Sequence, residues 1–570
     1  MLNIESFVEN VNILFKLAPK RISFVVILST ITAIVEALLL KNIALFIEYL
    51  SNNTSTSLIN IKNISIELFL IALLSGILRI YLTWYLPYVS TFLTAKLGRK
   101  IAYDLTKVDP IALETYTKEE LTDTLTTQIS IASLAIRQGL QCFYYVLTQA
   151  TLMITAFYLA PEIMISSISI IIVFYILFYK SISSKVNNLS IAISDANISL
   201  LSQTLSLINE LVGYSLNPKP KKIQIDIDKS LNLLKDTEVS SAFLTTFPRY
   251  AIESIGIMLI AIVPFIVFND TGETLSIATI FTDLGVFAYS VQKLLPNSQG
   301  IYSCITDIKT KEVSLSRVIR LYKLTSKYSR RINIEKIIPY QIHQINISKG
   351  LVQPPLNNAI SINADFSISK GDSIALIGPT GSGKTTIIKT LIGSYPLKKG
   401  ELKVNNKTIV RYSEDYFNYR SSIAYVAQNS RIIQGGLIEN ITLEIDPKLI
   451  NYDFYEKCCK IASINISLKK KLEDINDLKY GKNLSGGQIQ RIAIARAIYQ
   501  NLSILVLDES TSALDQNTQE LVLESIKEFY KEKILIKITH RLETLKIFNR
   551  VLEIRDYRVN ELKPKEFYGL

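Results

Sequence analysis

The sequence has 570 residues, of which 48% are hydrophobic, and a formal net charge of +12 at pH 7. This length is too great for one ordinary core, so at least two domains are expected. The positive charge alone would fit nucleic-acid binding, but no dense run of lysine and arginine with interleaved aromatic residues accompanies it. Cytoplasmic loops of membrane proteins carry the same excess, and no nucleic-acid partner is expected.

Apolar runs of nearly membrane-spanning length fill the N-terminal half. A spanning helix needs about 20 mostly apolar residues. The predicted spans are Ile22–Leu50, Ile64–Tyr88, Gln138–Ala160, Ile163–Ile182, Tyr250–Phe268 and Leu275–Leu295. Any one of these runs fits a buried helix of a soluble protein. Together they have too few polar partners for a soluble shell, so they predict a membrane domain.

The loops between these runs predict its orientation. The loop Ser51–Asn63 contains one lysine, and Asn269–Thr274 contains neither lysine nor arginine. Basic residues gather on the other side, within Lys16–Arg21, Lys96–Lys107 and Lys180–Lys222. The positive-inside rule therefore predicts a multi-pass protein of the plasma (inner) membrane, with both termini and the C-terminal domain in the cytoplasm.

The two predicted cytoplasmic connections, Thr91–Arg137 and Ser183–Arg249, are long and carry apolar residues at helical spacing. We expect the spanning helices to continue through them beyond the bilayer. Turns are predicted near Leu113–Glu120 and Asn209–Pro218, where such helices can touch a soluble domain.

Several charged residues lie inside the predicted spans, and each is costly in a bilayer. They are Glu36, Lys41, Arg79, Glu253, Asp283 and Lys293, with Arg249 at an edge. One interpretation is structural pairing, as between Arg249 and Glu253 at positions i and i+4. The other is a cationic lining for an anionic substrate, and the sequence leaves both open.

A phosphate-binding loop marks the C-terminal part. The apolar strand Ser373–Ile377 precedes it, and an apolar helix follows from Ile387. The loop consists of Gly378, Pro379, Thr380, Gly381, Ser382, Gly383, Lys384, Thr385 and Thr386. The glycines let backbone N–H groups turn toward phosphate oxygens, Lys384 reaches the β- and γ-phosphates, and the Thr385 hydroxyl can bind Mg²⁺. The motif predicts ATP and Mg²⁺ as cofactors.

A second buried strand, Ile504–Leu507, ends in two carboxylates. Asp508 is placed to hold Mg²⁺, and Glu509 is placed to polarise an attacking water. On its own this pattern is weak, and it gains weight from the phosphate-binding loop upstream.

Between these motifs stands Leu484-Ser485-Gly486-Gly487-Gln488, which resembles the signature sequence of the ATP-binding cassette (ABC) transporters. The resemblance extends over essentially the whole chain. It implies an all-α six-helix transmembrane domain (1–325), a linker (326–339) and an α/β P-loop NTPase (ABC) domain (340–570). One membrane domain preceding one cassette on a single chain is similar to the exporter half-transporters.

The resemblance also implies roles for individual residues. Gln428 matches the Q-loop glutamine, His540 matches the switch histidine, and Ser512–Asp515 matches the D-loop that crosses the dimer interface. The implied catalytic set is Glu509, His540 and Gln428, and the implied Mg²⁺ set is Thr385, Gln428 and Asp508. The signature residues Ser485, Gly486, Gly487 and Gln488 are expected at the nucleotide of a second cassette. The partner is then a second copy of the chain or a related half-transporter.

Two positions depart from the family pattern. Ala427 stands where a proline usually precedes the glutamine of the Q-loop. An aromatic residue that stacks on adenine is expected upstream of the P-loop, but Ile347–Pro355 offers none, and Leu351 lies near the expected place.

The cargo is predicted from two short segments. Phe247–Gly256 and Lys293–Pro296 are similar to spans five and six of the lipid-linked oligosaccharide flippases and related polysaccharide or glycolipid exporters. This likeness implies that Arg79, Arg249 and Lys293 face a cavity and bind an anionic head of a lipid-linked or amphipathic substrate. A multidrug or lipid exporter, and less so a peptide exporter, are the alternatives. Outside transport, the alternative is a soluble ABC ATPase.

Overall fold

The structure is a computed structural model that forms two compact units. One contains Met1–Val108 and Thr115–Ser329, and the other contains Asp109–Glu114 and Arg330–Leu570. We call them the helical unit and the α/β unit. The residues described are 4–51, 55–113, 116–159, 186, 188–210, 221–270, 277–329, 337–353, 361–464, 469–470, 484–511 and 513–562.

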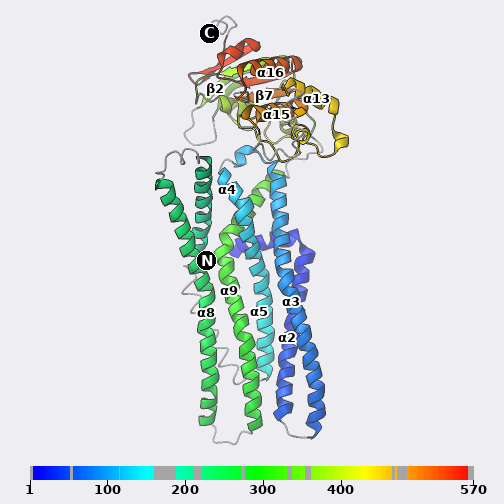
Figure 1. Ribbon diagram of the computed structural model, residues 1–570, viewed down its shortest axis with the longest axis vertical. Helices are drawn as coiled ribbons and strands as arrows, with labels where there is room; N and C mark the ends of the chain where they lie inside the picture. Colours follow the sequence, from blue (N-terminus) through cyan, green and yellow to red (C-terminus); the bar gives the residue numbers. More distant parts are fainter. Residues whose placement is uncertain are drawn as a thin grey trace. The chain divides into compact units, whose positions relative to one another are not determined.

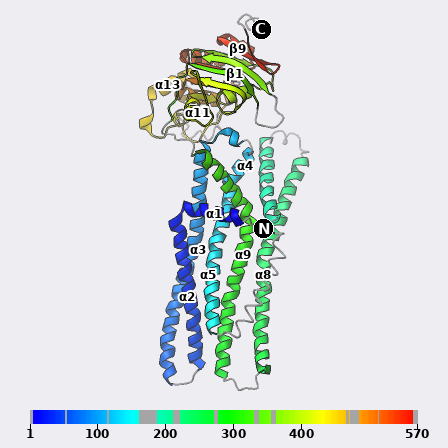
Figure 2. The same ribbon diagram turned by 180° about the vertical axis from the view of Figure 1, so that it is seen from behind.

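Long helices make up the helical unit. They are α1 (Ile4–Leu17), α2 (Pro19–Ser51), α3 (Ser55–Leu105), α5 (Ile129–Leu159), α8 (Lys221–Asp270) and α9 (Ile277–Ser329), with the short α4 (Lys118–Asp123) and a π-helical turn, η2 (Thr124–Gln128), before α5. Figure 1 shows α2, α3, α5, α8 and α9 running lengthwise beside one another. Figure 2 shows α1 lying across them.

The surface of these helices is apolar. On α3, Phe69, Ile80 and Trp84 are all more than half exposed. Polar contacts instead join one helix to the next: Gln149 on α5 donates to Ser298 on α9 at 2.9 Å. Apolar side chains outside and hydrogen bonds between helices are expected of a bundle in lipid. The helical unit is therefore a membrane domain.

Four helical stretches of the described residues are long and apolar enough to cross a membrane: Pro19–Ile47, Ile61–Leu105, Lys118–Leu159 and Asn188–Asn209. The first three overlap the predicted spans one to three, although the first and third end at Ile47 and Leu159, before the predicted ends at Leu50 and Ala160. Predicted spans five and six belong to α8 and α9, while Ile163–Ile182 lies outside the described residues.

The stretch Asn188–Asn209 falls in a predicted cytoplasmic connection and has the lowest mean hydropathy of the four, 1.2. Its polar residues bind neighbouring helices, since the Gln203 side-chain oxygen accepts from Ser230 on α8 at 3.1 Å. The polar residues that make such contacts lower the mean hydropathy of this stretch.

The first predicted turn begins earlier than the sequence indicated. Helix α3 ends at Leu105, the 3₁₀ turn η1 spans Pro110–Leu113, and α4 begins at Lys118. Pro110 lacks a backbone N–H and disfavours helical geometry in the residue before it, which places the break ahead of Leu113. The second predicted turn lies mostly outside the described residues.

A ten-stranded sheet forms the centre of the α/β unit, in the order β5-β4-β1-β2-β10-β9-β3-β8-β7-β6. The strands are β1 (Gln344–Val352), β2 (Ile362–Ser369), β3 (Ser373–Ile377), β4 (Leu397–Val404), β5 (Lys407–Thr408), β6 (Ile423–Val426), β7 (Ile504–Asp508), β8 (Ile534–Ile538), β9 (Arg550–Arg555) and β10 (Arg558–Leu562). The part β9-β3-β8-β7-β6 is parallel. The part formed by β5, β4, β1 and β2 is antiparallel, and the sequence had not predicted it.

The parallel strands fix the position of the phosphate-binding motif. Every residue of β3, β7 and β8 is buried, as expected for strands covered on both faces. The helices of this unit are α10 (Lys384–Leu391), α11 (Glu414–Arg420), α12 (Leu437–Thr442), α13 (Tyr452–Ile461), α15 (Gly486–Tyr499) and α16 (Gln516–Phe529). Because parallel strands share one carboxyl edge, the residues that follow β3, β6, β7 and β8 gather at that edge.

The segment Asp109–Glu114 belongs to the α/β unit through a buried carboxylate. Asp109 is 3% exposed, and its Oδ2 accepts a 2.5 Å hydrogen bond from Arg411. The hydroxyl of Tyr416 lies 3.0 Å from the same oxygen. Burial raises the pKa of Tyr416 to about 12, so its hydroxyl stays protonated and can donate.

Candidate functional site

Two glycines shape the phosphate-binding loop between β3 and α10. Gly378 and Gly383 have φ angles of 149° and 97°, in a region that side chains other than glycine rarely adopt. A Cβ on Gly383 would lie 2.1 Å from Ile362 Cδ1, and one on Gly378 would lie 2.7 Å from the Ile554 carbonyl oxygen. Only glycine fits either position.

The loop presents unused donors to a phosphate. Gly383 caps α10 without a side-chain hydrogen bond, so the first N–H groups of the helix remain open to an anion. The hydroxyl of Ser382 is buried without a hydrogen-bond partner among the described residues. Lys384 Nζ donates to the carbonyl oxygens of Gly378 and Pro379, at 2.8 and 2.9 Å. Burial lowers the pKa of Lys384.

The end of β7 carries the two predicted carboxylates. Asp508 is 7% exposed, and its Oδ2 accepts a 2.7 Å hydrogen bond from the hydroxyl of Tyr425 on β6. Burial raises the pKa of Asp508, and it raises the pKa of Tyr425 as well. The sequence analysis did not assign a role to Tyr425. Tyr425 lies three residues before Gln428, on a strand adjacent to β7, and this position could have identified it from the sequence.

The predicted catalytic residues meet at Glu509. Its Oε2 accepts a 2.7 Å hydrogen bond from Gln428, and its Oε1 lies 3.0 Å from His540 Nε2. Glu509 has a φ of 48°, an uncommon conformation for a residue with a side chain, and one that clusters at functional sites. The fold thus gathers Gln428 from the end of β6, Glu509 from β7 and His540 from β8.

The signature residues begin helix α15. Ser485 is its N-cap, and the Gln488 side chain completes a capping box with it. A Cβ on Gly487 would lie 3.0 Å from the Ala513 carbonyl oxygen. The two glycines therefore let the start of α15 approach the predicted D-loop closely, and Ser512 itself lies outside the described residues.

These side chains fit a nucleotide and a hard cation. The hydroxyl of Thr385, the carboxylate of Asp508 and the amide of Gln428 offer the oxygen atoms that Mg²⁺ prefers. Gln428 uses its side-chain nitrogen for Glu509, which leaves its carbonyl oxygen for another partner. For adenine, Leu351 lies in β1, and 354–360 are outside the described residues.

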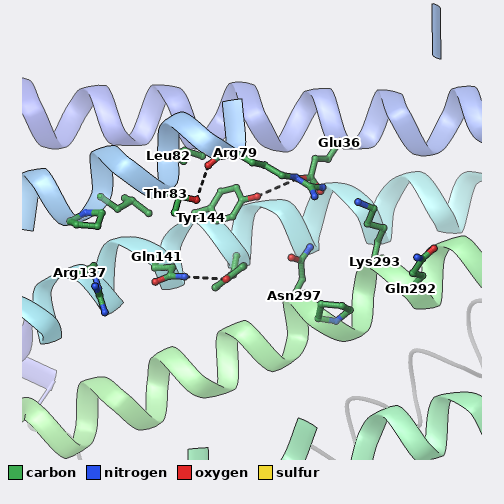
Figure 3. Close-up of a pocket in the computed structure, with 14 residues that line it drawn as sticks. Glu36, Arg79, Leu82, Thr83, Arg137, Gln141, Tyr144, Gln292, Lys293 and Asn297 are labelled. Atoms are coloured by element: carbon green, nitrogen blue, oxygen red, sulfur yellow. Dashed lines mark hydrogen bonds and ion pairs between the residues drawn. The ribbon is translucent and has the colours of Figure 1, made fainter. Parts of the chain in front are cut away.

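The helical unit contains a second candidate site, a cavity of about 590 Å³ among α2, α3, α5 and α9. Figure 3 shows Glu36, Arg79, Tyr144 and Lys293 at this cavity, on four different helices. The lining residues are Glu36, Arg79, Leu82, Thr83, Leu86, Pro87, Arg137, Gln141, Tyr144, Tyr145, Gln292, Lys293, Pro296 and Asn297.

An ion pair occupies one wall of this cavity. Arg79 donates to Glu36, a residue only 3% exposed, and the Tyr144 hydroxyl donates to the same carboxylate oxygen at 3.2 Å. The lining holds three cationic side chains, Arg79, Arg137 and Lys293, against the carboxylate of Glu36. Arg79 is therefore structurally paired, and the lining has a cationic excess, while an anionic substrate stays a prediction.

Comparisons with known proteins agree with this architecture. A family model described as "ABC transporter" matches residues 362–512. The structure of a bacterial Atm1-family ABC exporter with ATP bound superposes with a TM-score of 0.76 and 17% identity, covering 95% of both chains. Residues 362–512 thus match the ABC transporter family model, and the chain has the fold of that exporter.

Curated relatives match this chain over part of their length. "ABC transporter B family member 29, chloroplastic" of Arabidopsis thaliana is 31% identical over 302 residues, which are 51% of this chain and 45% of that protein. "ATP-dependent lipid A-core flippase" of Aliivibrio fischeri is 35% identical over 204 residues, which are 35% of this chain and 34% of that protein. The matched regions thus span less than half of either relative.

The structure brings three of the predicted site residues together, since Gln428 and His540 both contact Glu509. The predicted fold class is confirmed, with a helical membrane domain followed by an ABC domain. Arg79 and Lys293 line one cavity. Arg249 lies on α8, but its side chain and that of Glu253 are outside the described residues. The functional roles of these residues remain predictions.

Arg137 is a charged residue of this cavity that was not expected there from the sequence. It was taken as the end of a cytoplasmic connection, whereas α5 runs unbroken from Ile129 to Leu159. Arg137, Gln141 and Tyr144 follow one another at i, i+4 and i+7 and so share one helix face. That spacing was the available signal.

Proposed function

We propose that this chain is the subunit of an ATP-hydrolysing exporter or flippase that moves a lipid with an anionic, hydrogen-bonding head group across the membrane. Residues 1–325 serve as the transmembrane domain, 326–339 as the linker and 340–570 as the ATP-binding domain. The proposed cargo is inferred from the cavity, whose lining contains three cationic side chains and a single carboxylate.

The proposed ATP site uses the residues gathered at the carboxyl edge of the sheet. The N–H groups of the loop from Gly378 and the start of α10 bind the phosphates, and Lys384 turns from the loop carbonyls toward the β- and γ-phosphates. Thr385, Asp508 and Gln428 would hold Mg²⁺, which when bound would neutralise the charge that develops on the phosphate oxygens. Glu509 accepts the proton of the attacking water, while His540 and Gln428 hold its carboxylate in place.

A second cassette completes this site in the proposed assembly. Ser485, Gly486, Gly487 and Gln488 contact the nucleotide bound by the partner, which is a second copy of the chain or a related half-transporter. Donors from two sides, in a closed site that excludes water, stabilise the spread charge of the transition state. ATP binding thus favours closure, and hydrolysis permits separation.

The role of Asp508 in this ATP site can be tested by removing the hydroxyl of Tyr425. Tyr425→Phe removes the donor to Asp508 and retains the ring. We expect the Mg²⁺ concentration for half-maximal ATPase activity to rise about tenfold, because outer-shell partners of metal ligands contribute about 10–100-fold to affinity. A Mg²⁺ titration of purified protein in vesicles measures it. Tyr557→Phe, at an exposed tyrosine of the same unit, is the control, and an unchanged titration of Tyr425→Phe would contradict the role given to Asp508.

The cavity chemistry favours a polar anionic head over a hydrophobic drug. Besides its charges, the lining contains the amides of Gln141, Gln292 and Asn297 and the hydroxyls of Tyr144, Tyr145 and Thr83. Arginine and lysine bind phosphate oxygens well, and the amides and hydroxyls suit sugar hydroxyls. A lipid-linked oligosaccharide combines both features. Names of relatives such as "ATP-dependent lipid A-core flippase" support a charged glycolipid as cargo.

The proposed location is the plasma (inner) membrane, with both termini and the ATP-binding domain in the cytoplasm. The distribution of lysine and arginine among the loops supports this orientation.

Charge removal in the cavity tests the cargo. We expect Arg137→Gln and Lys293→Gln each to raise the lipid concentration for half-maximal ATPase stimulation about 10- to 100-fold, because a charge-assisted hydrogen bond contributes about 1.5–3 kcal/mol. Glu36→Gln should have the opposite effect, since it removes the carboxylate that competes with the anion for Arg79. Proteoliposomes with a polyprenyl-pyrophosphate sugar, phosphatidylglycerol or a hydrophobic amine provide the measurement.

Arg99→Gln, on the exposed part of α3, is the matched control and should leave stimulation unchanged. If the pyrophosphate sugar stimulates the wild type and both cavity variants equally, the cationic cavity does not bind the anionic head group. Stimulation by the hydrophobic amine alone would favour a multidrug exporter instead.

A further inference from the structure

A lysine lies in the buried strand β8 of the α/β unit, between β3 and β7. Lys537 is 1% exposed on β8, and its ladder partners are Ala375 on β3 and Leu507 on β7. Lysine is almost never fully buried unless it is paired, because burying an amine without a hydrogen bond is costly. A lysine in this place therefore requires a specific partner.

The partner is the threonine two residues after Glu509. Lys537 Nζ donates to Thr511 Oγ1 at 2.8 Å. The same oxygen accepts from Gln519 Nε2 of α16 at 3.1 Å. Thr511 and Gln519 are 1% and 2% exposed, so these hydrogen bonds form away from water.

The network continues to the residue after His540. The side-chain oxygen of Gln519 accepts from Arg541, and Arg541 Nη1 also lies 3.5 Å from the carbonyl oxygen of Leu514. Side chains at positions 537, 519 and 541 thus join the segment 511–515 to the end of β8 by two routes.

The same segment contacts the signature helix on its other side. The N–H of Ala513 donates to the side-chain oxygen of Gln490 on α15 at 3.0 Å. The segment is therefore held between α15 and the end of β8, and Lys537 provides the direct link from β8.

We propose that Lys537 is a positioning residue for ATP hydrolysis: through Thr511 it fixes the segment 511–515 relative to His540, so that the two respond together when a second cassette closes. This inference rests on the proposed function, in which His540 holds the Glu509 carboxylate and a second cassette completes the ATP site. Lys537 itself acts through Thr511 and touches no nucleotide.

The electrostatic setting of Lys537 adds a measurable signature. Burial, together with the neighbouring Arg541 guanidinium, lowers the pKa of Lys537 to about 7. The ladder partners from β3 and β7 are apolar, and α16 faces Thr511 with the neutral amide of Gln519. The amine is therefore largely neutral above pH 7, and its protonation places a second positive charge near Arg541.

The test compares Lys537→Met, Thr511→Val and the double variant as full-length protein in proteoliposomes. We expect each single variant to lower kcat about tenfold or more, while the Kd for ATP and the KM change less than twofold. The double variant should be no slower than Thr511→Val, because Thr511→Val already removes the hydrogen bond with Lys537 as well as the one with Gln519. Thr511→Ser keeps the hydroxyl and should retain wild-type kcat. If Lys537→Met folds poorly, the comparison of Thr511→Ser with Thr511→Val still tests the hydrogen bond.

The pH profile separates positioning from a purely structural role. Wild-type kcat should rise as the pH increases through about 7, and this rise should be absent in Lys537→Met. The control Lys531→Met, at an exposed lysine just before β8, should follow the wild type. If the wild type is active and Lys537→Met matches its kcat and pH profile, the inference about Lys537 is wrong and the proposed function is unaffected. A wild type without ATPase activity would remove the proposed function as well.

Discussion

Replacing Glu509 with glutamine is expected to lower kcat for ATP hydrolysis about 10³-fold while ATP still binds. The amide has nearly the same shape as the carboxylate and keeps a neighbour for Gln428 and His540, which lie 2.7 and 3.0 Å from it. It cannot accept the proton of the attacking water, and general bases contribute about 10²–10⁴-fold to rates. ATPase assays in proteoliposomes and nucleotide titrations of the same samples measure the two quantities.

Two comparisons make this experiment specific. Glu524→Gln changes an exposed glutamate on α16 of the same unit and should leave kcat within twofold of wild type. His540→Ala should also slow hydrolysis, because it removes the side chain that holds Glu509 Oε1. A Glu509→Gln variant that keeps more than a tenth of wild-type kcat would show that another group accepts the proton.

The geometry around Glu509 was largely predictable because its parts are local in sequence. A buried strand, a glycine loop and a helix follow one another between Ser373 and Leu391, so the motif carries its own structural context. The strand that ends at Asp508 was equally legible from its apolar residues. Parallel strands bring their carboxyl ends together, and this rule alone joins segments that are far apart in the chain.

Contacts between remote side chains were less accessible. Arg79 and Glu36 lie 43 positions apart on different helices, and nothing in the periodicity of either helix selects the other as its partner. Arg137 was missed because a basic residue at the edge of an apolar run reads as a cytoplasmic flank. Lys537 was passed over because one lysine does not interrupt an otherwise apolar strand, and only the fold shows that Thr511 is within reach.

The antiparallel strands were also absent from the sequence interpretation. Strand β2 alternates buried and exposed residues along most of its length, and β4 is largely solvent-facing. Lysines at Lys398, Lys399 and Lys403 give β4 the composition of a loop. Its pairing with β1, rather than its own residues, makes it a strand.

Loss of the Asp109 carboxylate is the second large effect that we expect, and it concerns coupling rather than chemistry. Asp109→Ala should reduce the number of substrate molecules moved per ATP hydrolysed about tenfold, while kcat for ATP falls much less. Asp109 binds Arg411 and Tyr416 of the α/β unit, and the chain leads back from Asp109 to α3, which ends at Leu105. This short connection can transmit movement only while the carboxylate holds it to the unit.

The energetic basis is the burial of the pair. Breaking a buried ion pair costs about 3–5 kcal/mol, and less is expected here because the Arg411 side chain is 22% exposed. Arg411 also donates to the Ser394 carbonyl oxygen at 3.1 Å, so it remains anchored after the substitution. The α/β unit should then fold normally and hydrolyse ATP, and the loss should fall on the attachment of the 109–114 segment.

The measurement is the ratio of lipid translocation to ATP hydrolysis in the same proteoliposomes. Asp109→Glu keeps the charge and should restore part of the ratio, whereas Asp453→Asn, at an exposed aspartate of α13, should leave it at the wild-type value. If translocation and hydrolysis fall in equal proportion in Asp109→Ala, the contacts of Asp109 with Arg411 and Tyr416 serve the folding of the α/β unit and not coupling. Since Glu509→Gln stops hydrolysis at its source and Asp109→Ala spares it, the two variants separate the chemical step from its transmission to the membrane helices.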